Sequence, residues 1–135
     1  MSKTSYPLLT LCWEKNNRVS SINNYNKKLK SKSYFYFSSS FFPKPKIIDS
    51  VKSSQIIIGS PIINKRIHYE FSDNFLKKKE LVSRINGEFV IFLIEKSYNK
   101  ITLINDRFAS IPLYYFNNEK LFIVSTSYLE IIRLQ

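Results

Sequence analysis

A continuous apolar run restricts what this chain of 135 residues can fold into. Residues 89–94, FVIFLI, contain no polar side chain and stand between Gly87-Glu88 and Glu95-Lys96. A strand with one solvent-exposed face alternates apolar and polar residues. An unbroken apolar run therefore predicts a strand that is covered by protein on both faces. The fold must therefore place protein on both sides of this strand.

The segment that precedes this strand has a helical period. Apolar side chains in residues 72–86 fall near one face of a helix, and Ser72 or Asp73 can cap its first turn. These apolar residues are Phe75, Leu76, Leu81, Val82 and Ile85. The pattern predicts one helix that leads into the buried strand.

Strand and turn signals continue to the end of the chain. Residues 97–100 form a tight connection to a strand over 101–107, and the NNEK sequence at 117–120 joins two further strands. Ser127 and Glu130 have the spacing of a capping box before a last apolar run. The C-terminal half is thus predicted to be a helix, four strands and a helix.

The N-terminal half has weaker signals, with strands expected over 5–13, 33–42 and 54–63 and a polar loop over 14–32. Sheets covered on both faces and few helices predict an α+β fold. We expect mostly antiparallel sheets that pack on each other with helices outside. The length predicts a single domain over residues 1–135.

Composition excludes several classes of site. With only two glycines, Gly59 and Gly87, the chain cannot form a glycine-rich phosphate loop, and with one cysteine, Cys12, and one histidine, His68, it has no plausible zinc set or internal disulfide. We therefore expect no cofactor and no metal.

The net charge of +11 would suit nucleic acid, but the lysines are scattered, so a basic nucleic-acid-binding module is only an alternative. No apolar run could span a membrane, and we expect a cytoplasmic protein.

The order of motifs in residues 81–132 resembles the class II glutamine amidotransferase domain of asparagine synthetases. The segments that carry the resemblance are INGEFVIFLIE, NDRFASIPLYY and KLFIVSTSYLEII. They look most like the asparagine-synthetase-like enzymes that form amides in peptide pathways, such as lasso-peptide cyclases. The resemblance implies the αββα sandwich of N-terminal-nucleophile hydrolases, which this short chain could leave incomplete. We expect no synthetase domain in these 135 residues.

Family chemistry needs an N-terminal cysteine whose own α-amino group acts as the base. Here Ser2 follows the initiator methionine, and Cys12 would need removal of a propeptide, so both are weak candidates for the nucleophile. A lone free cysteine is more often a small buried hydrophobe.

The resemblance also covers residues that we expect to be structural. In this sequence they are Gly87, Phe89, Asp106, Arg107, Pro112, Tyr114 and Tyr115. We expect the tyrosines to pack in the core and at a sheet edge. Ala109 stands where the family usually has glycine, which suggests an altered turn.

These observations favour a degenerate amidotransferase-like domain without glutaminase activity. It would support an ATP-dependent, asparagine-synthetase-like amide-forming enzyme by binding that enzyme or its peptide or amino-acid substrate. The alternative is a diverged amidohydrolase that uses Ser2 or a processed Cys12.

Overall fold

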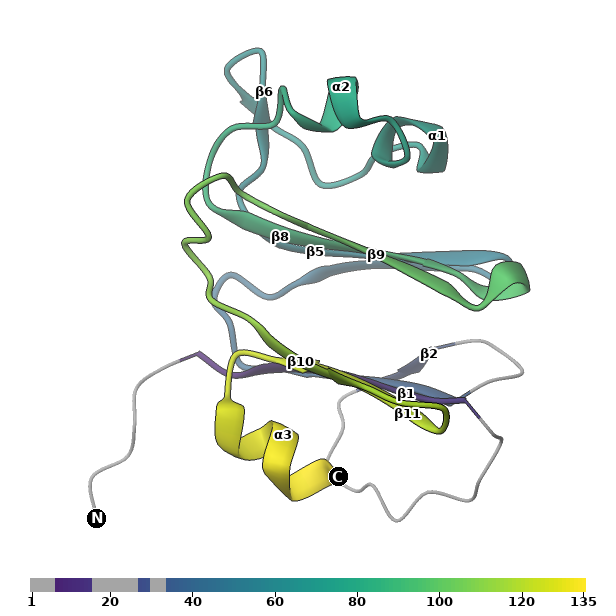
Figure 1. The fold of residues 1–135 in the computed structure, drawn as a ribbon. Coiled ribbons are helices and arrows are strands. Elements are labelled where there is room, and N and C mark those ends of the chain that lie inside the picture. The colour runs from purple at the N-terminus through teal and green to yellow at the C-terminus, as the bar shows by residue number, and fades with distance from the viewer. Residues whose placement is uncertain (1–6, 16–26, 30–33) are drawn as a thin grey trace, which may run out of the picture. The chain divides into compact units, whose positions relative to one another are not determined.

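The computed structural model describes residues 7–15, 27–29 and 34–135. Two compact units make up the chain (Figure 1): Met1–Lys44 with Leu113–Gln135, called unit 1, and Pro45–Pro112, called unit 2. Ser5 and Tyr6, at the start of the first expected strand, lie outside the described residues, as does most of the expected polar loop.

Unit 2 is built on a four-stranded antiparallel sheet. Its strands, in spatial order, are β4 (Lys46–Asp49), β5 (Ser53–Gly59), β8 (Phe89–Glu95) and β9 (Lys100–Asn105). Every residue of β8 is buried, which confirms the strand that the apolar run predicts. A 3-10 turn, η1 (Lys96–Tyr98), and Asn99 in the left-handed conformation make the expected tight connection from β8 to β9.

Short helices cover one face of this sheet (Figure 1). They are α1 (Asp73–Leu76) and α2 (Lys79–Val82), and they follow the small hairpin of β6 (Ile62–Ile63) and β7 (Arg66–Ile67). Leu76 and Ile85 pack with Ile57, Ile91 and further apolar side chains of the sheet into one core cluster. Ser72 caps α1 as expected, because its hydroxyl accepts a hydrogen bond from the Phe75 N–H.

The prediction of a single helix over 72–86 is wrong. Lys78 has an extended backbone and separates α1 from α2. Leu76 and Ile85 are nine positions apart, so a continuous helix would turn them to faces about 180° apart. The break allows both side chains to enter the same core, where they are 2% and 5% exposed.

Unit 1 contains a five-stranded antiparallel sheet in the order β10-β11-β1-β3-β2. Its strands are β1 (Leu9–Glu14), β2 (Lys27–Leu29), β3 (Tyr34–Ser39), β10 (Tyr114–Asn117) and β11 (Leu121–Ser125). The helix α3 (Tyr128–Leu134) lies on one face of this sheet, beside β10 and β11 (Figure 1). The second hairpin and the last helix are therefore confirmed.

The loop expected over residues 14–32 is wrong in part, because Glu14 belongs to β1 and Lys27–Leu29 forms β2. Polar composition misleads here since β2 is an edge strand, and lysine is common on exposed sheet edges. Its Leu29 is buried. Residues 16–26 and 30–32 of that expected loop lie outside the described residues.

The capping box before α3 forms only in part. The Ser127 hydroxyl accepts a hydrogen bond from the Glu130 N–H at 3.3 Å, as its spacing predicts. The reciprocal bond does not form, because the Glu130 carboxylate pairs with Arg133 while the Ser127 N–H donates to the Ser125 hydroxyl.

The α+β class with mostly antiparallel sheets is confirmed. Each sheet has helices on one face, and the packing of the two sheets into an αββα sandwich stays a prediction. β10 is an edge strand, and its Tyr114 and Tyr115 side chains are 48% and 73% exposed. The expectation that these tyrosines lie at a sheet edge is thus correct, while their placement in a core is wrong.

Candidate functional site

Asp106 organises the loop that follows β9 in unit 2. Its side chain is 5% exposed, and one carboxylate oxygen accepts a hydrogen bond from the Phe89 N–H at 3.2 Å. The other oxygen accepts from the Phe108 N–H at 3.1 Å, the Ser110 N–H at 3.2 Å and the Ser110 hydroxyl at 3.0 Å. One carboxylate therefore closes the loop over 106–110 and ties it to the first residue of β8.

These hydrogen bonds also set the acidity of Asp106. Burial raises the pKa of this carboxyl, but the hydrogen bonds from Ser110, Phe89 and Phe108 lower the pKa by more, so it lies below its usual value. The residue is an anion at neutral pH, and its oxygens are already engaged by donors. Asp106 is therefore suited to hold a loop and is a poor proton acceptor for catalysis.

We expect a characteristic acid dependence from Asp106. Because its pKa is lower in the folded state than in the unfolded chain, its contribution to stability is present above the unfolded pKa and is lost as pH falls through the folded pKa. The gap in unfolding free energy between wild type and Asp106→Asn should be full above about pH 5 and should shrink below about pH 4. Urea unfolding of both proteins across this range measures it, and a pH-independent gap would contradict the assignment.

Ala109 adopts a left-handed backbone conformation, with φ of 49°, and its N–H donates to the Asp106 carbonyl oxygen at 3.0 Å. The loop therefore has a conformation that glycine accommodates best, although the sequence has alanine. The altered turn relative to the family stays a prediction.

Restoring glycine at this position should stabilise the protein. Ala109→Gly relieves left-handed strain of about 1–2 kcal/mol and increases the entropy of the unfolded chain, so we expect a net gain of about 0.5–1 kcal/mol. Thermal or urea unfolding measures the gain. The matched control is Ser83→Gly, at an exposed position with φ of −62°, where glycine should destabilise. Equal effects of the two substitutions would contradict the role of the left-handed conformation.

Both glycines of the chain lie where β5 leaves the sheet beside the start of β8. A Cβ atom on Gly59 would stand 2.3 Å from the Glu88 carbonyl oxygen, and one on Gly87 would stand 2.2 Å from the Ser60 carbonyl oxygen. Their φ angles, +84° and +94°, are also in the region that favours glycine. Close backbone approach therefore requires glycine at both positions, and Gly87 is structural in this arrangement.

A small pocket lies between the segment that contains Gly87 and the Asp106 loop. It is lined by Ile85, Asn86, Gly87, Asp106, Arg107 and Phe108, and its volume is about 100 Å³. Pockets for drug-sized ligands usually have about 300–1,000 Å³, so this one is too small to enclose glutamine. Arg107 is exposed, and among the described residues no carboxylate lies within ion-pair distance of its guanidinium. The pocket can accept a few water molecules or a small anion.

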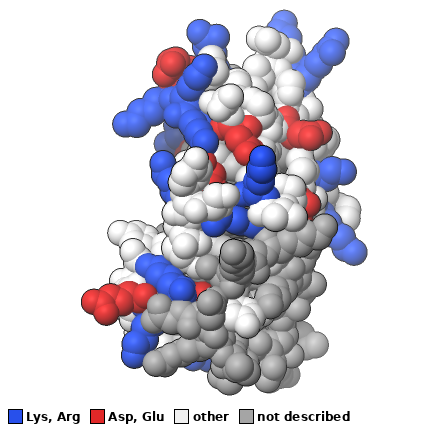
Figure 2. Space-filling model, turned by 90° about the vertical axis from the view of Figure 1, so that its right-hand side faces the viewer, with Lys and Arg blue, Asp and Glu red and all other residues white. Residues whose placement is uncertain are grey.

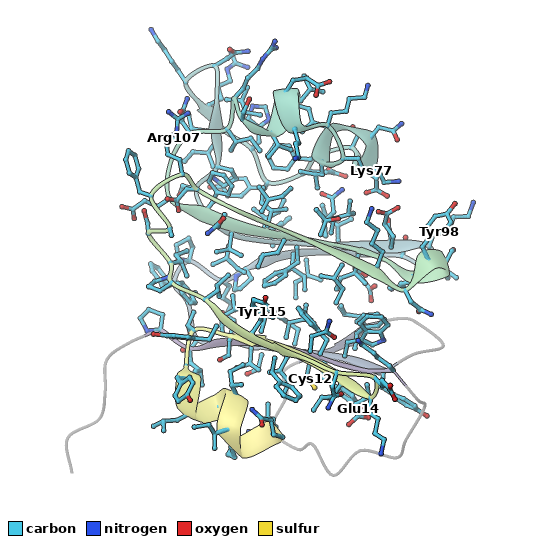
Figure 3. The ribbon with its side chains drawn as sticks, viewed as in Figure 1. Cys12, Glu14, Lys77, Tyr98, Arg107 and Tyr115 are labelled. Carbon is cyan, nitrogen blue, oxygen red and sulfur yellow. The ribbon has the colours of Figure 1, made fainter. Side chains whose placement is uncertain are left out.

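Cys12 lies in unit 1, under α3 (Figure 3). β1 is paired on both sides, with Cys12 opposite Ile123 of β11 and Tyr36 of β3. The side chain is fully buried and packs with Ile123 and Ile131. Burial, with a smaller effect of the Glu14 charge, raises the pKa of the thiol to about 12, so only about one thiol in 10⁵ is ionised at pH 7.

Position within β1 also bears on processing at Cys12. Leu9, Thr10 and Leu11 precede Cys12 in β1 and pair with β3, and Thr10 and Leu11 also pair with β11. Cleavage before Cys12 would remove these residues from the middle of the sheet. Ser2, the other candidate nucleophile, lies outside the described residues.

The remaining residues of the resemblance are dispersed. Phe89 is buried in the core of unit 2, and its backbone N–H holds Asp106, whereas Pro112 is exposed. Tyr114 makes an edge contact with the Tyr128 ring, and Tyr115 packs beside Phe122. The structure thus brings Gly87, Asp106 and Arg107 together at one pocket. Sequence reasoning missed Ser110, for which the only signal was a hydroxyl four residues after a buried aspartate.

Surface charge on one face and the metal-binding groups of the described residues also bear on the kind of site. On the face drawn in Figure 2, Lys and Arg side chains stand in separate groups with acidic and uncharged side chains between them. No group of three or more His, Cys, Asp or Glu side chains in the described part of the chain could hold a metal ion. The described helices are all too short or too polar to cross a membrane.

A family model described as "Glutamine amidotransferase domain" matches residues 65–133 of this chain. The match spans just over half of the sequence and includes β8, the Asp106 loop, both strands of the second hairpin and most of α3. The chain therefore belongs to the glutamine amidotransferase domain family. Neither the curated proteins nor the solved structures provide a match. The expected family is confirmed, and the asparagine synthetase branch stays a prediction.

Proposed function

We propose that this chain is a degenerate glutamine amidotransferase domain without glutaminase activity. The observation that carries this proposal is the state of Cys12, the chain's sole cysteine, which is buried under α3 with a pKa of about 12. Glutaminase chemistry of this family requires a thiolate beside a free α-amino group. A protonated thiol in the middle of a paired strand offers neither.

The small pocket supports the same proposal. Its volume of about 100 Å³ and the full use of the Asp106 carboxylate by hydrogen-bond donors fit a structural loop better than a substrate site. In this proposal Asp106, Gly87 and Phe89 keep the fold of the family, and Arg107 is free to contact another molecule. A single free cysteine also fits a reducing compartment, such as the cytoplasm.

We further propose that the domain supports an ATP-dependent, asparagine-synthetase-like amide-forming enzyme by binding that enzyme or its peptide or amino-acid substrate. Support for this part comes from the motifs in residues 81–132, which resemble the amidotransferase domain of asparagine synthetases. The test is the rate of amide formation by such an enzyme from the same host, with ammonia as nitrogen donor, with and without this protein. We expect the protein to raise the rate or the substrate affinity, and no change in either would overturn this part.

Thiol reactivity tests the proposed state of Cys12. Iodoacetamide should label Cys12 in the native protein at least about 100-fold more slowly than in urea-unfolded protein, because alkylation needs an exposed thiolate. Intact mass spectrometry follows the label. Rapid labelling of the native protein, or covalent capture of Cys12 by an electrophilic glutamine analogue, would show that the thiol is available and would favour the diverged amidohydrolase.

A further inference from the structure

Among the described strands, none pairs with the outer edge of β10, which leaves backbone groups of two residues open there. Asn118 donates its N–H to the Leu121 carbonyl oxygen at 2.9 Å, which makes this pair a hydrogen-bonded pair of the hairpin. In an antiparallel ladder such pairs alternate with non-hydrogen-bonded ones, so Phe116 and Tyr114 bond to β11 while Asn117 and Tyr115 face away from it. The N–H and C=O groups of Tyr115 and Asn117 are therefore directed to the open edge.

This edge lacks the charge that protects the other edges. The edge strands of the two sheets are β2, β4, β9 and β10. The first three each contain lysine, at positions 27, 28, 46 and 100, and lysine at an edge discourages pairing with another chain. The sequence of β10, Tyr-Tyr-Phe-Asn, has no charged residue in a chain whose net charge is +11. The residues of β10 itself therefore add no charge that would repel a second copy.

Apolar side chains extend the same surface onto α3. The Tyr128 ring makes an edge contact with Tyr114 at a centroid distance of 5.8 Å. Tyr128, Leu129 and Ile132 are 59%, 75% and 53% exposed, although each is large and apolar or aromatic. The two charged residues of α3, Glu130 and Arg133, form an ion pair with each other. We call β10 together with these α3 residues the β10–α3 surface.

We propose that the β10–α3 surface binds a second copy of this chain by antiparallel pairing of the two β10 strands. A two-fold axis through Phe116 would place Tyr115 opposite Asn117 of the second copy, and this pair can exchange both of its N–H···O=C hydrogen bonds. The same axis repeats the exchange on the other side of Phe116. In this register the outward N–H and C=O groups of Tyr115 and Asn117 in one copy pair with those of the second copy. Two identical β10 strands are therefore complementary to each other.

The same two-fold axis stands perpendicular to the joined sheet, so both α3 helices lie on one face of it. Leu129 and Ile132 can then be covered beside the paired strands, which adds apolar burial to a short strand contact. The Lys15 ammonium donates to the Asn117 side-chain oxygen at 2.5 Å and to the Asn118 carbonyl oxygen at 2.7 Å. Because both copies are strongly basic, added salt should strengthen the dimer.

Sedimentation equilibrium of the full chain tests this proposal. We expect a dimer with a dissociation constant of about 10 µM, as suits a small interface. Tyr115→Pro removes an outward N–H but no bond to β11, and Ile132→Lys places a charge on the patch. Each should raise the dissociation constant about tenfold or more. Val51→Lys, at a 79% exposed position in the β4–β5 turn, is the matched control and should leave it unchanged.

Amide hydrogen exchange supplies a second readout. The Tyr115 and Asn117 amides should become protected as the protein concentration rises, while amides of the β9 edge should not. If Tyr115→Pro fails to fold, Ile132→Lys and these amides decide the matter. A wild-type chain that stays monomeric at about 100 µM overturns the proposal, because the β10–α3 surface then does not bind a second copy. A dimer with unchanged affinity in the folded variants also overturns it.

Discussion

Replacing Asp106 with alanine is expected to destabilise the protein by about 3 kcal/mol, because several donors lose their only acceptor in a buried loop. The Phe89 N–H is the most costly of these, since it lies at the first residue of the fully buried β8. The Phe108 and Ser110 N–H groups, which are partly buried, lose the other carboxylate oxygen. Urea unfolding followed by circular dichroism measures the change.

Two further variants test whether the loss of stability comes from the hydrogen bonds to the Asp106 carboxylate. Arg107→Ala changes the exposed neighbour, makes no change to these hydrogen bonds, and should stay within about 0.5 kcal/mol of wild type. Asp106→Asn keeps one acceptor oxygen and should fall between alanine and wild type. If Asp106→Ala were as stable as Arg107→Ala, the carboxylate would not hold the loop as described.

Replacing Gly87 with alanine should cost about 3 kcal/mol or more, and the variant is expected to fold poorly. Two costs add here. A side chain at φ of +94° is strained, and its Cβ atom would stand 2.2 Å from the Ser60 carbonyl oxygen, a backbone atom that cannot rotate away. Ser60 is itself fixed, because its N–H donates to the Glu88 carbonyl oxygen at 2.8 Å.

Asn86→Ala is the matched control for this glycine. It changes the neighbouring exposed side chain and keeps the paired backbone bonds between Asn86 and Ile62, so its stability should change by less than about 0.5 kcal/mol. Comparing the urea midpoints of the two variants isolates the effect of a Cβ at position 87. A Gly87→Ala protein within about 1 kcal/mol of wild type would contradict the close approach of the two segments.

Local patterns in the sequence predicted the buried strand β8 and the hairpins of the C-terminal half. The unbroken apolar run gave the central strand β8, and turn residues located both C-terminal hairpins. The single helix over 72–86 was wrong because Leu76 and Ile85, which would lie on opposite faces of a continuous helix, pack in the same core. β2 was missed because its sequence, Lys-Lys-Leu, follows a polar segment and has the composition of a loop.

The candidate site was predictable only in part. The resemblance singled out Asp106 and Gly87 as structural residues, and both line one pocket in the structure. Three of the four donors to Asp106 are the backbone N–H groups of Phe89, Phe108 and Ser110, and every residue except proline carries such a group. Sequence alone therefore could not identify them. Gly59 lies against the Glu88 backbone and Gly87 lies against the Ser60 backbone. These contacts join segments that are distant in the sequence, so composition does not reveal them.

The central claim, loss of glutaminase activity, is tested most directly by one measurement. The protein is purified from its own host, its intact mass and N-terminus are determined, and ammonia release from glutamine is measured on the same material. We predict a chain that keeps Cys12 inside β1 and releases no ammonia above the rate without protein. Ammonia release by a chain that begins at Ser2 or at Cys12 would contradict the account and establish an active amidohydrolase.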